Sequence, residues 1–142
     1  MLEKLLEGIE KPGRYINHEA GTKSKTLNYI GEHPGGHSLM KRILYSADGA
    51  KETATGIMDC SALQVPGKLS WLHLSGLSDT AVVRGIGDCL GLHPLQMEDI
   101  VNTEHRAKIE ITDALLFSIV KHCTFSDAAT HIEHVVIVLT AS

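Results

Sequence analysis

The chain has 142 residues, of which 43% are hydrophobic and 4% aromatic, and this composition suits one globular domain with an aliphatic core. The formal net charge is −4 and the 13 lysines and arginines are spread along the chain, so the sequence offers neither a basic patch for nucleic acid nor a polybasic segment for a membrane surface. The longest apolar stretch, residues 135–139, falls short of the roughly 18 residues of a membrane span.

The cysteines give a prediction about the redox state of the chain. Their number is odd, and no secretory signal precedes them. We therefore expect Cys60, Cys89 and Cys123 to be reduced thiols of a cytosolic protein, mostly buried as small hydrophobic side chains.

The N-terminal half of the chain predicts strands and turns. Residues 1–24 form a poorly defined N-terminal segment, and residues 31–36, with the sequence GEHPGG, are a loop. Strands are predicted over residues 27–30, 41–47 and 69–74, with a strand or helix between residues 50 and 58, and with turns at Asp48-Gly49 and Pro66-Gly67.

Two helices follow in the predicted order. Ser78 is a good N-cap and Gly91 a good C′ residue for a helix over residues 78–90, although Gly85 and Gly87 in its interior cost about 1 kcal/mol each. Pro94 suits the first position of a second helix. The buried stripes are predicted to be Val82, Val83, Ile86 and Leu90 in the first helix and Met97, Ile100 and Val101 in the second.

The second helix carries the candidate functional residues. If its apolar residues face the core, then Glu98, Asp99 and Asn102 turn to another surface, where the two carboxylates form an acidic ridge. In an arbitrary protein such a pair is most often a solvated helix face. His93, directly before Pro94, is expected to cap or pack at the start of this helix.

The last part of the chain predicts two strands and, with them, the fold class. Residues 108–124 alternate as a strand with a bulge or bend at Thr112-Asp113, and residues 132–140 are β-branched on both faces, which is typical of a strand covered on both sides. The pattern therefore predicts an α/β fold, a three-layer αβα sandwich with a mixed β-sheet. An unpaired edge at the last strand would also favour association with another chain.

One group of motifs carries a family resemblance. In chain order these are Trp71, His93-Pro94-Leu95, Glu98-Asp99-Ile100 and Arg106-Ala107-Lys108. This order resembles the cytoplasmic N-terminal domain of CorA-type magnesium/cobalt transporters, in which proline usually stands at the place of Ala107. The resemblance implies that residues 25–142 are a CorA-like cytoplasmic regulatory domain, C-terminally incomplete and without membrane helices, with the αβα fold.

The resemblance also implies a function and a site. In the family, the residue matching Asp99 binds a regulatory divalent cation together with a carboxylate of the neighbouring subunit in a pentamer, and the residue matching Glu98 belongs to the same acidic surface. It implies weak Mg²⁺ binding, with Co²⁺ as the other candidate, and a homo-oligomeric parent protein in the cell (inner) membrane. This part of the protein is expected to be soluble and cytoplasmic, to bind no nucleic acid and not to enter the membrane itself.

Other functions remain open at this stage. The zinc-transporting branch of the same superfamily and a free-standing soluble ligand-binding or interaction domain of the same fold are the alternatives. An enzyme is not expected, because the sequence has neither a G-x-S-x-G motif nor a Walker loop. His33 and His37 are separated by Pro-Gly-Gly and cannot form a helical metal site, and no C-x-x-C pair is present to complete a zinc site.

Overall fold

The structure is a computed structural model, and it describes residues 26–32, 35–54, 60, 63, 65–126 and 129–140. The predicted N-terminal segment, residues 1–24, lies outside the described residues, as does the end of the region between residues 50 and 58.

The first sheet contains three antiparallel strands in the order β2-β1-β3. They are β1 (Leu39–Ser46), β2 (Gly49–Ala54) and β3 (Leu69–Ser75), and they lie close to the predicted strands. Ser46 and Gly49 are opposite each other at the hairpin turn, where Gly49 has a φ of 129°. The predicted Asp48-Gly49 turn is therefore confirmed. It needs glycine because a residue without a Cβ adopts this positive φ without steric cost.

Two helices connect the two sheets, namely α2 (Thr80–Leu90) and α3 (Pro94–Val101). The N-cap of α2 is Asp79, whose Oδ1 accepts a hydrogen bond from the Val82 N–H at 3.3 Å, so the predicted cap at Ser78 is wrong by one residue. The hydroxyl of Ser78 donates to the Gly36 carbonyl instead. Gly91 ends α2 with a left-handed φ of 68°, as predicted.

The second sheet is also antiparallel and has the order β4-β5-β6. Its strands are β4 (Lys108–Ile111), β5 (Leu115–Phe125) and β6 (Thr130–Thr140). The predicted bulge or bend at Thr112-Asp113 is a hairpin turn between two strands and not an irregularity within one, because the Thr112 N–H donates to the Leu115 carbonyl at 2.9 Å.

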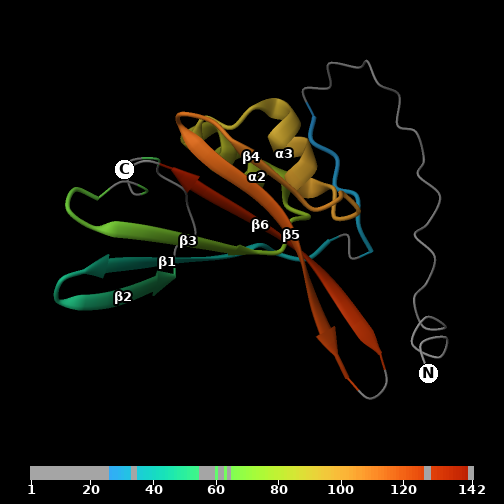
Figure 1. Ribbon diagram of the computed structural model, residues 1–142, viewed down its shortest axis with the longest axis horizontal. Helices are drawn as coiled ribbons and strands as arrows, with labels where there is room; N and C mark the ends of the chain where they lie inside the picture. Colours follow the sequence, from blue (N-terminus) through green and yellow to red (C-terminus); the bar gives the residue numbers. More distant parts are fainter. Residues whose placement is uncertain are drawn as a thin grey trace.

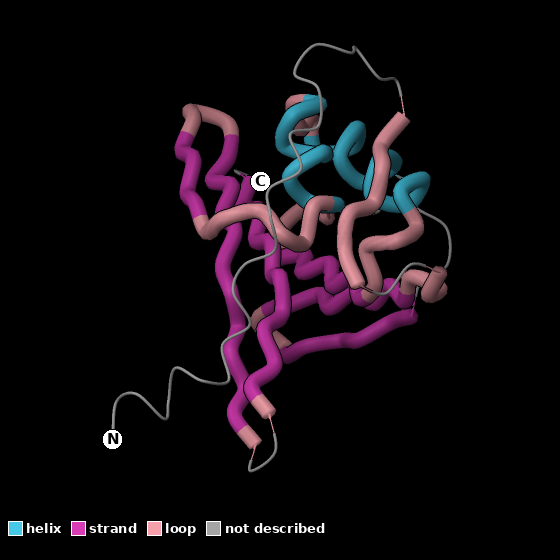
Figure 2. Tube along the Cα trace, turned by 90° about the vertical axis from the view of Figure 1, so that its right-hand side faces the viewer, coloured by secondary structure: helices cyan, strands magenta, loops and turns pink. Residues whose placement is uncertain are grey.

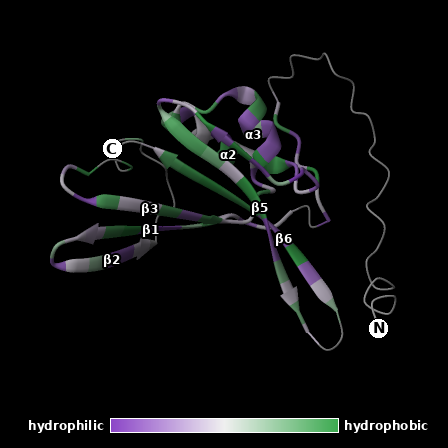
Figure 3. Cartoon of the chain, viewed as in Figure 1, coloured by the Kyte–Doolittle hydropathy of each residue, from purple (hydrophilic) through white to green (hydrophobic). Residues whose placement is uncertain are grey.

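The core lies between the inner face of this second sheet and the two helices. Phe117 and Ile119 on β5 are fully buried together with Val101 at the end of α3. The buried faces of the helices match the predicted stripes at Val83, Met97, Ile100 and Val101, while the other stripe positions are partly buried. Hydrophobic residues follow β5 and β6 toward the helices (Figure 3).

The predicted layer arrangement differs from the structure. Strands and helices are both present, but the described strands form two antiparallel sheets and not one mixed sheet (Figure 1). Both helices lie on the same side of the strands (Figure 2). On β6, Ile137 and Leu139 are 39% and 56% exposed, so the prediction that this strand is covered on both sides is wrong for the described part of the chain.

The predicted strand over residues 27–30 is reduced to a single β-bridge. Ile30 pairs with Asn102 in parallel, through hydrogen bonds from the Ile30 N–H to the Val101 carbonyl and from the Thr103 N–H to the Ile30 carbonyl. This bridge ties the start of the described chain to the end of α3. Leu27, three residues earlier, is buried in the core.

The cysteines also differ from the prediction. Cys60 and Cys89 form a disulfide that joins α2 to the segment before β3, so they are not the reduced thiols expected from the sequence. Cys123 is a free thiol, but it is exposed on β5 and not buried. The odd number of cysteines did not reveal this pairing because spacing alone cannot show which side chains meet.

Candidate functional site

The start of α3 is fixed by a local hydrogen-bond pattern. His93 is the N-cap, and its Nδ1 accepts from the Leu95 N–H at 3.2 Å. The His93 N–H donates to Oε1 of Gln96 at 2.9 Å, and Pro94 occupies the first helical position, where no N–H is needed. The capping role predicted for His93 is confirmed, and it sets the direction in which the rest of α3 projects its side chains.

Asp99, one turn further along α3, faces the entry of β4. Lys108 Nζ donates to Asp99 Oδ2 at 2.5 Å, and His105 Nε2 lies 3.1 Å from Asp99 Oδ1. The Asp99 side chain is 20% exposed, so the ion pair is partly shielded from water. Both carboxylate oxygens of this candidate metal ligand therefore have nitrogen partners within the chain.

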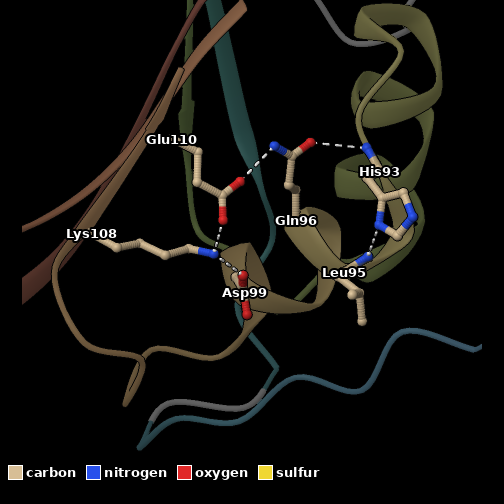
Figure 4. A pocket seen from close by; sticks show the side chains of 6 residues that line it. All are labelled: His93, Leu95, Gln96, Asp99, Lys108 and Glu110. Carbon is tan, nitrogen blue, oxygen red and sulfur yellow. Dashed lines mark hydrogen bonds and ion pairs between the residues drawn. The ribbon is translucent and has the colours of Figure 1, made fainter. Parts of the chain in front are cut away.

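The Lys108 ammonium also contacts a second carboxylate. It donates to Glu110 Oε1 at 2.6 Å, and Glu110 Oε2 accepts from Gln96 Nε2 at 2.9 Å. These contacts connect His93, Gln96, Glu110, Lys108 and Asp99 into one series of hydrogen bonds, which we call the polar chain (Figure 4). Gln96 is buried, so the polar chain satisfies a side chain that would otherwise be costly to bury.

The charges in the polar chain stabilise one another. Burial acts against the charged form of Lys108, but the hydrogen bonds and negative charges of Asp99 and Glu110 outweigh it and raise the Lys108 pKa above its ordinary value. The hydrogen bond from Lys108, and after it that from Gln96, lowers the pKa of Glu110. The Lys108 ammonium also lies 5.4 Å from the centre of the Phe117 ring, within the range of a cation–π contact.

The polar chain lines a surface cavity of about 340 Å³. The cavity wall is formed by α3 with its N-cap and by the inner face of β4. The lining residues are His93, Leu95, Gln96, Asp99, Lys108 and Glu110. Five of the six carry polar groups, and these include both signs of charge. The cavity is therefore suited to a small polar or charged group and not to an apolar ligand.

Glu98 and Asp99 do not form the predicted acidic ridge. Glu98 is exposed, whereas Asp99 is partly buried and paired with Lys108. Neighbouring positions on a helix point about 100° apart, so the two carboxylates face different surroundings. Metal binding by Glu98 and Asp99 stays a prediction.

The remaining motif residues take other roles. Trp71 lies on β3 in the first sheet, away from the polar chain. It is opposite Ile43 of β1 and is 52% exposed. Leu95 is exposed at the rim of the cavity, and Lys108, predicted only as part of a motif, is the central cation of the polar chain.

Sequence reasoning missed three residues that surround Asp99 and Lys108, namely Gln96, Glu110 and His105. Gln96 was detectable, because a Gln three residues after a capping residue is typical of a capping box. Glu110 was detectable as well, because residues two apart on a strand share a face with Lys108. No local pattern indicated His105, which reaches Asp99 from the loop before β4.

The side chains around Asp99 supply few of the ligands that a metal ion needs. Among the residues that the structure describes, no group of three or more His, Cys, Asp or Glu side chains could hold a metal. Mg²⁺ is commonly bound through one or two carboxylates and several waters, so Asp99 suits it in chemical type. Asp99 Oδ2 can bind a metal ion only after the Lys108 ammonium has left it.

Comparison with known proteins finds similarity between one segment of the chain and a transport protein. No family model matches the sequence. A segment of 56 residues is 36% identical to the cobalt/magnesium transport protein CorA of Thermotoga maritima. Over this segment the chain is similar to CorA. The similar segment makes up 39% of this chain and 16% of that protein, so the chain spans about a sixth of the relative it matches.

The name of that relative describes cobalt and magnesium transport, and it is the transport protein that the matched segment resembles. Neither α2 nor α3, the helices of the described chain, is long and apolar enough to cross a membrane.

Proposed function

We propose that this chain is the cytoplasmic, Mg²⁺-sensing regulatory part of a CorA-type channel for divalent cations, with the complete protein in the cell (inner) membrane. The observation that carries the proposal is the 36% identity to CorA over 56 residues. The finer αβα arrangement of such a domain is part of the proposal.

The chemistry of α3 supports the proposal. Asp99 contributes a carboxylate at the rim of the cavity, and Glu98, on the next position, contributes an exposed one. A bound divalent cation would neutralise carboxylates that otherwise repel one another across a subunit interface. Weak affinity is suitable here, because free Mg²⁺ at about ten times Kd already stabilises the bound arrangement by about 1.4 kcal/mol.

The first test is the role of Asp99 in the complete membrane protein. We expect Asp99→Asn to weaken the protection from proteolysis that Mg²⁺ gives the parent protein, shifting the Mg²⁺ concentration for half-protection upward by about tenfold, which corresponds to losing about 1.4 kcal/mol of binding. Asp113→Asn is the matched control, because Asp113 is exposed in the β4–β5 turn and away from α3.

Two results would contradict the proposal. Unchanged protection in Asp99→Asn would remove Asp99 from cation sensing. A reading frame that continues past Ser142 without membrane-spanning segments would remove the transport function and favour a soluble binding domain.

The proposal includes a homo-oligomer, and the second sheet suggests where copies of the chain would meet. β6 forms one edge of its sheet and exposes Ile132, Ile137 and Leu139. An edge strand with exposed aliphatic side chains is a template for pairing with a second copy.

We expect size-exclusion chromatography with light scattering to show a mass above the monomer that rises with concentration. Ile137→Lys should shift the chain to monomer by placing a charge on the edge strand, whereas Leu39→Lys, at an exposed position on the central strand β1, should not. A monomer at all concentrations would contradict this part of the proposal.

A further inference from the structure

We propose that Lys108 is an internal competitor for a divalent cation at Asp99, and that it sets the affinity of that carboxylate by releasing Asp99 while it keeps its contact with Glu110. The inference rests on the proposed function, since it describes how the chain's own cation regulates the same carboxylate.

The first step of the argument is the occupation of Asp99. Lys108 Nζ lies 2.5 Å from Oδ2, and His105 Nε2 lies 3.1 Å from Oδ1. A cation that takes up either oxygen at the usual Mg²⁺–oxygen distance of about 2.1 Å must share it with a nitrogen already there. On Oδ2 the metal cation and the ammonium would repel each other strongly, because the site is partly shielded from water. The ammonium therefore has to leave Oδ2 before a cation binds there.

The second step is that the Lys108 ammonium has a second carboxylate partner. Its ammonium already contacts Glu110 Oε1 at 2.6 Å, and it lies over the Phe117 ring. Glu110 is itself held by Gln96, which is anchored to the backbone of His93. Leaving Asp99 therefore does not strand an unpaired ammonium, and the movement needs only a rotation of the lysine side chain.

The third step concerns the site without the lysine charge. Asp99 Oδ2 and Glu110 Oε1 both contact the same nitrogen, so they converge on one point at the cavity (Figure 4). Two converging carboxylates are a common protein contribution to a Mg²⁺ or Mn²⁺ site. An apolar side chain of similar length in place of Lys108 would leave these carboxylates free to take a divalent cation.

The experiment measures Mn²⁺ binding to the 142-residue chain by electron paramagnetic resonance of the free ion. We expect Lys108→Met to bind Mn²⁺ at least about tenfold more tightly than the parent chain, and Lys108→Arg, which keeps the positive charge, to remain close to the parent. Lys41→Met is the matched control, because Lys41 makes an exposed ion pair with Glu52 in the other sheet. It should leave Mn²⁺ affinity unchanged.

Further variants decide where the ion binds. Adding Asp99→Asn to Lys108→Met should remove the gain in affinity. Equal or weaker Mn²⁺ binding in Lys108→Met than in the parent would overturn the proposal, and so would a gain that survives Asp99→Asn.

A measurement on the unsubstituted chain covers the case in which Lys108→Met does not fold. During a Mg²⁺ titration, the ¹⁵N signal of the Lys108 ammonium should shift together with the backbone amide of Asp99, and a stationary ammonium signal would overturn the proposal. Failure of the proposed function is distinguishable, because it appears as unchanged proteolytic protection in Asp99→Asn of the membrane protein, whatever Mn²⁺ binding to Lys108→Met shows.

Discussion

Gly87→Ala is expected to lower the free energy of unfolding by about 1–3 kcal/mol, although alanine is the better helix former. A Cβ at Gly87 would meet the Met97 side chain, with its Cγ at 2.8 Å and its sulfur closer still. Met97 is 3% exposed within the core, so its thioether has little space to move aside. Urea denaturation of the parent chain and the variant measures the difference.

Gly85→Ala is the matched control two positions earlier in α2. A Cβ there meets no atom within 4 Å, so the substitution should raise the free energy of unfolding by up to about 1 kcal/mol. The two alanine substitutions thus have opposite expected signs in one helix. Stabilisation by both would show that α2 and α3 do not approach as closely at Gly87 as the structure has them.

This pair of glycines illustrates what the sequence could predict about the fold. The 3.6-residue period and the capping signals predicted both helices and their buried faces, because these depend on neighbours in the chain. The same signals counted Gly85 and Gly87 as equal costs. Only the position of α3 against α2 distinguishes them, and local patterns do not contain that position.

The strands also separate into features that local sequence predicts and features that it does not. The first hairpin was predicted from alternation and a turn signal, both local. The layer arrangement was predicted from β6, whose aliphatic residues on both faces indicated cover on both sides, yet Ile137 and Leu139 are exposed in the described chain. β-branched residues favour a strand whether or not a second layer covers it, so composition alone could not settle the arrangement.

The candidate site was predicted in part. The position of Asp99 on α3 followed from helical spacing, and the capping role of His93 followed from Pro94. The partners of Asp99 could not be predicted, because Lys108 and His105 lie beyond the end of the helix and reach it only through the turn into β4. The sequence therefore suggested an acidic ridge, whereas in the structure Asp99 has the Lys108 ammonium and a His105 ring nitrogen as partners.

The second large effect is expected from pH, through His134 on the inner face of β6. Burial, and then the positive charges of Lys121 and His105, lower the pKa of His134 to about 4. Lys121 Nζ lies 3.2 Å from His134 Nδ1 and donates to the Thr103 carbonyl at 2.6 Å, and burial lowers the pKa of this lysine as well. A charged imidazole is therefore unfavourable at this place in the folded chain.

The sign of the effect follows from proton uptake. In the unfolded chain a histidine binds its proton below about pH 6.5, whereas folded His134 does so only near pH 4. Between these values the unfolded state holds more protons, so stability falls as the pH is lowered. We expect His134 to account for a loss of about 2 kcal/mol between about pH 7 and about pH 4.5 in urea denaturation.

His134→Gln should remove that part of the pH dependence, while the carboxylates of the polar chain, such as Glu110, keep contributing their own. Val138→Ala is the control on the same strand and face, and it should lower stability by a similar amount at both pH values. Lys121→Met should reduce the loss only in part, because burial is the larger cause of the shift and the lysine charge the smaller. If His134→Gln retains the full loss, or Lys121→Met abolishes it, then burial of the neutral imidazole is not its main cause.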